Sequence, residues 1–230
     1  MAEYLQIGIV PVLLTLIAYQ FGLLCQRKTK SPLCNPILIS VVIVLLFLFA
    51  TGTSYSEYKQ GTAYISWLMT PATVCLAIPM YEQLQILKRN FPMMVVGILC
   101  GSITCVIMVL AFAFLFRFDS VLTASLLPKS ITSAIGVPLS EMAGGMASIT
   151  TAAIILTGIL ASMLGTTFCR VFRLTDPVAQ GVAFGTAGHV IATARANELG
   201  ELIGAASSLS LVVAGLLTAA AFPLLIRVIS

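Results

Sequence analysis

The sequence predicts an all-α polytopic membrane protein with about four regular spans followed by an inverted repeat of two units, each a broken or re-entrant helical segment plus one span. Of the 230 residues, 59% are hydrophobic and 9% are charged, whereas soluble domains carry roughly 25% charged residues. The apolar residues fall in runs near the roughly 20 residues that a helix needs to cross a bilayer. Proline, glycine and charge interrupt the chain before each of the last two runs.

The charged and metal-binding residue types exclude several classes of protein. The net charge of +4 comes from basic residues that are spread over short loops, so they indicate membrane orientation rather than a nucleic-acid surface. A single histidine and the absence of a CxxC pair make a metal or another resident cofactor unexpected. The cysteines are expected to be free thiols, buried or close to the membrane surface: Cys25, Cys34, Cys75, Cys100, Cys105 and Cys169.

The four regular spans are predicted at residues 7–24, 36–52, 63–81 and 92–116. The first run lacks the basic region and cleavage site of a secretory signal, so we expect it to be retained as a span. The loops after the first and third spans are basic, with Arg27, Lys28, Lys30, Lys88 and Arg89. The positive-inside rule therefore predicts that these loops are cytoplasmic and that the amino terminus faces outward.

Beyond Arg117 the pattern changes. Segment 121–143 contains Pro128, Lys129 and Pro138, and each proline removes a backbone donor that a regular helix needs. A clean span follows at 147–168. Segment 178–200 is again interrupted, by glycines, and the chain closes with a span at 203–229.

The two interrupted blocks are related by a shift of 57 positions, which lays Pro128 over Gly185 and Glu141 over Glu198. The charges favour two re-entrant hairpins that enter from opposite sides, with arms of roughly 16 Å and tips at PKS and GTAGH near the midplane. Broken helices that cross fully remain the alternative. We expect a scaffold at 1–117 and a transport unit at 118–230, made of 118–173 and 174–230.

Lys129 and Arg195 are the strongest candidates for a binding site. A cation deep in a bilayer costs at least about 2.5–3.5 kcal/mol and is tolerated where it faces a watered cavity or a partner. An anion is the natural partner, and neighbouring side chains can donate to its oxygens. The predicted substrate-binding residues are Lys129, Ser130, Thr132, Ser133, Thr186, His189, Thr193 and Arg195.

Structural explanations compete with these roles. Arg195 can pair with Glu198 three residues on, and Lys129 can pair with an acid or reach the membrane surface. His189 can relay a proton or bind substrate, or it can be a satisfied hydrogen-bonding group. Glu141 and Glu198 can carry coupling protons or be structural residues at helix ends, and for Glu141 the structural role is favoured.

The sequence allows two other functions to be considered, an enzyme and a pore. Ser130 beside Lys129 suggests a serine–lysine nucleophile, but neighbours on a helix point about 100° apart and no oxyanion motif is present, so no enzyme is predicted. A holin-like pore is the stronger rival to a carrier, because it needs only a polar path.

Several blocks closely resemble the LrgB/CidB family, which includes YohK-type bacterial proteins and the plastid glycolate/glycerate translocator. They are LLPKSITSAIG, SEMAGGMASITTAAIILTGIL, DPVAQGVAFGTAGHVIATARANELGE and SSLSLVVAGLLTAAAFP, with NPILIS, TGTSYSEY and PMYEQL earlier in the chain. Family members typically have a proline where this chain has Ala134 and a serine where it has Gly188. These departures are expected to alter the geometry of the tips or the choice of substrate.

The resemblance implies one of two functions: carriage of small monocarboxylates such as glycolate, glycerate and pyruvate, or holin/antiholin-like modulation of murein hydrolase activity. Members of the family commonly work beside a smaller LrgA/CidA-type membrane protein, which in the plastid carrier is fused to the amino terminus. The resemblance therefore also implies a separate LrgA/CidA-type partner for this chain. We therefore expect a multi-pass protein of the bacterial inner membrane, an oligomer in the lipid bilayer, with a small carboxylate as substrate and no nucleic acid.

Overall fold

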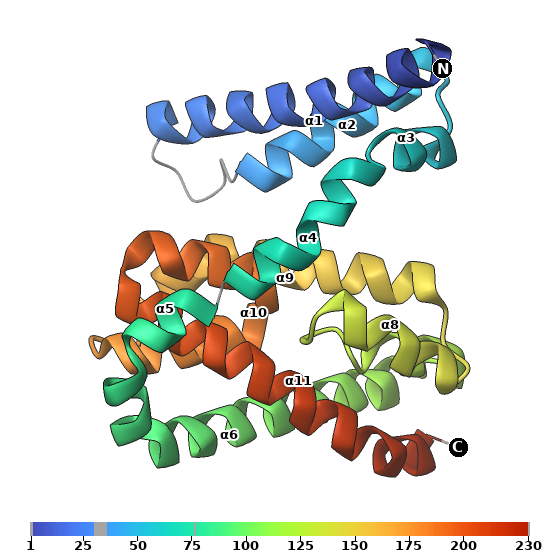
Figure 1. The fold of residues 1–230 in the computed structure, drawn as a ribbon. Coiled ribbons are helices and arrows are strands. Elements are labelled where there is room, and N and C mark those ends of the chain that lie inside the picture. Colours follow the sequence, from blue (N-terminus) through green and yellow to red (C-terminus); the bar gives the residue numbers. More distant parts are fainter. Residues whose placement is uncertain (1, 30–35, 76, 230) are drawn as a thin grey trace. The chain divides into compact units, whose positions relative to one another are not determined.

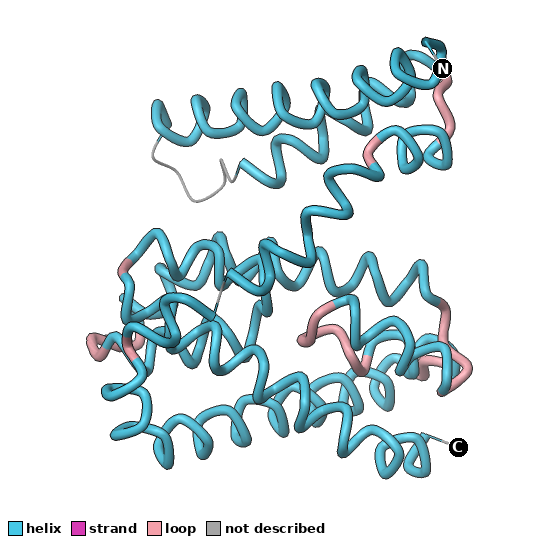
Figure 2. The backbone as a smooth tube through the Cα atoms, viewed as in Figure 1, coloured by secondary structure: helices cyan, strands magenta, loops and turns pink. Residues whose placement is uncertain are grey.

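The computed structural model describes residues 2–29, 36–75 and 77–229, and every regular element in this part of the chain is a helix (Figures 1 and 2). The chain divides into two compact units, residues 1–75 and 76–230, which are described separately. Cys34 and Asn35, a predicted thiol and the first residue of the NPILIS block, lie outside the described residues.

The described residues of the first unit form four helices: α1 (Ala2–Thr29), α2 (Pro36–Thr51), α3 (Tyr55–Gly61) and α4 (Ala63–Cys75). Helices α1 and α2 pack closely at Gly22, where an added Cβ would lie 2.7 Å from the carbonyl oxygen of Pro36. A hydrogen bond of 2.7 Å between the hydroxyls of Thr15 and Tyr58 joins α1 to α3. Gly22 is required by the close contact between α1 and α2 rather than by a turn.

In the second unit, residues 77–229 are described and form seven helices: α5 (Ala77–Glu82), α6 (Leu84–Phe116), α7 (Ser120–Leu126), α8 (Ser133–Met142), α9 (Ala147–Val171), α10 (Pro177–Leu199) and α11 (Glu201–Ile229). Among the described residues, four stretches are long and apolar enough to span a membrane: Gly8–Thr29, Leu84–Phe116, Ala147–Val171 and Glu201–Ile226. Helix α2 is apolar but only 16 residues long. The prediction of an all-helical, multi-pass membrane protein is therefore confirmed.

The third span, expected at 63–81, corresponds to α4 and α5, which lie on either side of residue 76, outside the described residues. One predicted boundary was wrong. The predicted loop EQLQILKRNF is mostly the first turns of α6, which begins at Leu84. Leucine, glutamine, lysine and arginine are good helix formers, so the charged stretch before Pro92 is helical. Pro92 lies inside α6 and does not mark its first residue.

The first interrupted segment is two short helices joined by a turn. Helix α7 ends at Leu126, and α8 begins at Ser133 with Pro138 inside it. Between them, Lys129 N donates to Leu126 O and Ile131 N to Pro128 O, so the PKS sequence occupies a tight turn. The second interrupted segment, α10, is broken at His189, whose φ of 43° and ψ of −142° are not helical.

The two halves of α10 pack along one stretch of α11 in opposite directions. In the first half of α10 the contacts move forward along α11, from Gly181 against Ile203 to Gly185 against Ser207. In the second half they move back, from Thr193 against Ser207 to Asn197 against Gly204. The chain therefore reverses near His189. Both ends of α10 lie near the start of α11.

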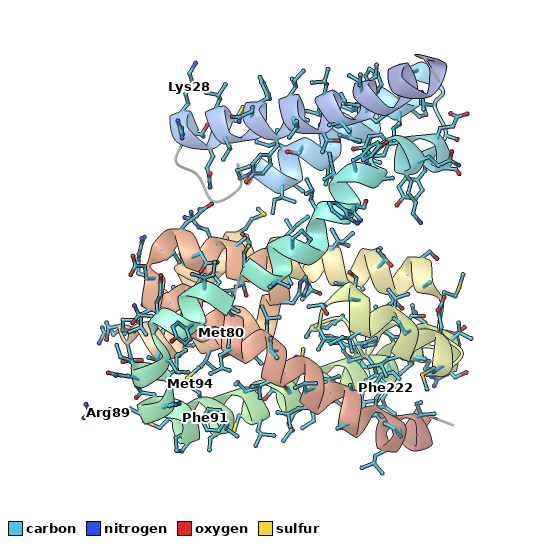
Figure 3. The ribbon with its side chains drawn as sticks, viewed as in Figure 1. Lys28, Met80, Arg89, Phe91, Met94 and Phe222 are labelled. Carbon is cyan, nitrogen blue, oxygen red and sulfur yellow. The ribbon has the colours of Figure 1, made fainter. Side chains whose placement is uncertain are left out.

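Apolar clusters mark opposite ends of the second unit, as the labelled Met94 and Phe222 show (Figure 3). The cluster around Met94 joins the first halves of α6, α10 and α11. The cluster around Phe222 joins the second halves of α6 and α11 to α7 and α8. The two interrupted segments thus pack at opposite ends of the long helices.

The expected boundary at residue 117 separates a scaffold from a transport unit by function, and it stays a prediction. Helix α6 packs against α10 and α11, so it belongs to the same compact unit as the interrupted segments, and the division falls between residues 75 and 76. Whether 118–230 moves as a transport unit stays a prediction.

Candidate functional site

Lys129 lies in a pocket of about 440 Å³ within the second unit. Apart from Lys129, Thr157 and the thiols of Cys105 and Cys169, the lining is apolar, and it includes leucine and phenylalanine side chains of α9 and α10. The ammonium donates to Cys105 Sγ at 3.3 Å and to Ser130 Oγ at 3.5 Å. Among the described residues no carboxylate pairs with it, so its partners are neutral.

A second, smaller chamber of about 10 Å³ lies between the two interrupted segments. Ser130 lines it from the turn after α7, and Thr186 lines it from α10, three residues before the break. Cys105 lines both this chamber and the larger pocket. The neighbouring Ser102 is about 27 Å from the first residue of α6 at 1.5 Å per residue, so the chamber lies near the middle of that helix.

Small residues of α6 allow α10 to approach this position. An added Cβ at Gly97 would lie 3.2 Å from Val182 Cγ1, and one at Gly101 would lie 2.8 Å from Thr186 Cγ2. With Cys105 these glycines form a stripe at intervals of four residues, which places them on one helix face. Cys105 was not among the predicted site residues because its span was expected to belong to the scaffold, although the spacing of Gly97, Gly101 and Cys105 is visible in the sequence.

Thr186 has an unusual hydroxyl. The residue is 7% exposed, and its Oγ1 has no hydrogen-bond partner among the described residues. Ser208 on α11 is the other described residue with such a buried hydroxyl, but it does not line the chamber. Native structures pair nearly all buried polar groups, so the Thr186 hydroxyl is a candidate ligand contact.

His189 anchors the break in α10 to α9. Its Nε2 lies 2.9 Å from the carbonyl oxygen of Ile154. A carbonyl can only accept, so Nε2 carries the proton and donates. Gly158 makes room for the ring, because an added Cβ there would lie 2.7 Å from His189 Cε1. This geometry supports the interpretation of His189 as a satisfied hydrogen-bonding group.

Thr193 stabilises the same break from the second half of α10. Its hydroxyl donates to the carbonyl oxygen of His189 at 2.8 Å and lies 2.8 Å from Ser207 Oγ. The side chain is fully buried. Both contacts are internal to the fold, so a role in substrate contact would require them to rearrange.

Arg195 pairs with Glu198 on the second half of α10. Their side chains are 31% and 53% exposed, and neither residue lines the pocket or the chamber. The structure thus brings together Lys129, Ser130 and Thr186, but does not bring Arg195 into the lining of the same cavities.

The remaining predicted residues lie on α8. Thr132 is its N-cap residue, without a hydrogen bond from the side chain to the helix, and Ser133 is the first helical residue. Glu141 is exposed near the end of the helix, as the structural interpretation expects. None of the three lines the pocket or the chamber.

Two sequence arguments change with the structure. Lys129 and Ser130 lie in a turn, not on a helix, and both contact Cys105, so the argument that their side chains diverge was wrong. At Gly188 an added Cβ would lie 2.4 Å from Ala161 Cβ. The serine typical of the family at this position therefore does not fit beside Ala161 without a shift.

The fold and the site define a class: a helical membrane protein with broken segments that meet at a small polar chamber beside a half-buried lysine. No cluster of three or more possible metal ligands occurs among the described residues. The sequence profile of the LrgB-like family matches residues 15–228. The chain belongs to the LrgB-like family, which confirms the resemblance drawn from the sequence. No solved structure matches the chain.

Proposed function

We propose that the protein is a secondary transporter of small monocarboxylates, such as glycolate, glycerate or pyruvate. The observation that carries this proposal is Lys129, a cation beside an apolar pocket whose described partners are only a thiol and a hydroxyl. Such a charge is favourable where it meets an anion or a watered cavity. A carboxylate would supply the missing negative charge.

In this proposal Lys129, Ser130 and Thr186 form the centre of the site. Thr132, Ser133, His189, Thr193 and Arg195 stay predicted substrate contacts, and Glu141 and Glu198 stay predicted coupling or structural residues. The first three are favoured because they line the cavities. The others would have to reach the substrate in another conformation of the carrier.

The two units 118–173 and 174–230 would be inverted repeats that enter the membrane from opposite sides. The reversal near His189 and the turn between α7 and α8 support two re-entrant hairpins. Their packing at opposite ends of α6 and α11 supports opposite entry. Transporters with such repeats bind substrate near the midplane and expose it alternately by movement of one repeat or bundle.

The basic residues support an orientation. Lys88, Arg89, Arg170 and Arg173 are near the start of α6 and the end of α9, at the end of the unit that carries the Met94 cluster. By the positive-inside rule this end faces the cytoplasm. The amino terminus would then be outside, in a bacterial inner membrane, in an oligomer or with an LrgA/CidA-type partner as the resemblance implies.

Uptake into proteoliposomes tests this function directly. Purified protein would be reconstituted, and entry of labelled glycolate, glycerate and pyruvate would be measured against concentration, with an uncharged solute of similar size as control. Saturable entry of at least one acid, blocked by excess unlabelled acid, is expected.

A holin-like pore or a modulator of murein hydrolase export is the alternative, and the same experiment separates it from a carrier. A pore needs no saturable site, so it would pass the acids and the uncharged solute without saturation. That result would overturn the transporter proposal.

A further inference from the structure

We propose that the small chamber between the two interrupted segments is a subsite for one oxygen atom on C2 of the substrate, and that Thr186 is the residue that reads it. This inference rests on the proposed function, because it adds a contact within the same site. The subsite makes the protein selective for acids with an oxygen on C2 over otherwise identical acids without that oxygen.

The Thr186 hydroxyl is the first reason. It is buried and has no partner among the described residues, although it lines the chamber. Its methyl group faces Gly101 across the helix contact, which fixes the side chain between α6 and α10. A hydroxyl held in this way is available to donate to, or accept from, a ligand oxygen.

The size of the chamber is the second reason. A cavity of about 10 Å³ holds about one water-sized group. Its other polar walls are the hydroxyls of Ser102, Ser130 and Thr218 and the thiol of Cys105. These groups can both donate and accept, so they suit either a hydroxyl or a keto oxygen.

The position beside Lys129 is the third reason. Ser130 Oγ accepts from the Lys129 ammonium and also lines the chamber. Cys105 contacts the same ammonium and lines both cavities. The cation and the chamber are therefore adjacent, as are the carboxylate and the C2 oxygen of a small 2-oxygenated acid.

Glycolate and acetate are the probes, because they differ only in the C2 hydroxyl. In proteoliposomes, Thr186→Val removes the hydroxyl and nearly preserves the shape of the side chain. We expect the KM for glycolate to rise by about tenfold or more, because a site that hydrogen-bonds a substrate hydroxyl loses that contact. The KM for acetate, measured directly or by competition, should change by less than about twofold.

Three further variants make the test specific. Thr186→Ser keeps the hydroxyl and should keep the preference for glycolate. Thr218→Val removes another hydroxyl of the chamber from α11 and should also reduce the preference, which tests the subsite if Thr186→Val does not fold. Ser208→Ala is the matched control, since it removes the other buried hydroxyl without a described partner, outside the chamber.

An unchanged ratio of the two KM values in both valine variants would overturn the inference while leaving transport intact. An equal loss for both acids would also overturn it, because a resident water or a packing role would affect them alike. If the wild-type protein transports none of glycolate, glycerate and pyruvate saturably, the proposed function itself fails, which is a distinct result.

Discussion

His189 donates a hydrogen bond from Nε2 to the carbonyl oxygen of Ile154, and this contact joins the break in α10 to the first half of α9. The ring occupies space that only a glycine at position 158 leaves free. The reversal of α10 thus depends on two residues that lie 31 positions apart in the sequence. The stability of this reversal can be tested by substitution of either residue.

Gly158→Ala should destabilise the protein. The added methyl group would lie 2.7 Å from His189 Cε1, and overpacking of this kind typically costs about 1–3 kcal/mol. The unfolding temperature in detergent would measure the effect. Gly8→Ala is the control, because nothing lies within 4 Å of its added Cβ and alanine favours the helix. Equal unfolding temperatures for the two variants would contradict the close contact.

Lys129→Met should abolish most of the saturable uptake without unfolding the protein. Methionine keeps the length of the side chain but removes the charge, and a hydrogen bond to a charged group contributes about 1.5–3 kcal/mol, or roughly 10- to 100-fold in affinity. The half-buried ammonium has only a thiol and a hydroxyl as described partners, so the substitution breaks no ion pair of the described residues and should not lower stability. Uptake and unfolding temperature would both be measured, with the exposed Lys88→Met as control. Wild-type uptake in Lys129→Met would exclude the lysine from the site.

Arg195→Ala and Glu198→Ala should each have small effects on stability. The pair is partly exposed, and pairs of this kind contribute about 0–1 kcal/mol to the free energy of unfolding. A double-mutant cycle on the unfolding temperature would measure the coupling. Because Arg195 stays a predicted substrate contact, we expect Arg195→Ala to reduce saturable uptake although the fold is kept. Wild-type uptake in Arg195→Ala would leave Arg195 with structural pairing alone.

The ends of the two hairpins should face opposite sides of the membrane. Met142 is at the end of α8 and Gly200 follows α10, so cysteines placed there report the two sides. In a background without native cysteines, an impermeant thiol reagent should label Met142→Cys from outside and Gly200→Cys only after the cytoplasmic face is opened. Labelling of both from one side would support broken helices that cross fully.

The sequence predicted the class of this protein and the positions of its interruptions. Long apolar runs require a helix in lipid because every backbone group must be paired internally, and α1, α6, α9 and α11 follow those runs. Pro128 and the glycine-rich stretch before His189 marked the two breaks, since proline removes a donor and glycine tolerates close contacts. Charge alone misplaced the start of α6, because lysine and arginine are compatible with a helix.

Only the tertiary structure decided which of the candidate residues share a site. Lys129 and Arg195 look alike in the sequence, as cations in interrupted segments, yet one lines an apolar pocket and the other pairs with Glu198 on its own helix. Cys105 and Thr186 became site residues because α6, α10 and the turn after α7 converge. The local sequence determines where a helix can break. The distances between side chains of different helices depend on how the helices pack, and the pattern of residues in one sequence does not specify that packing.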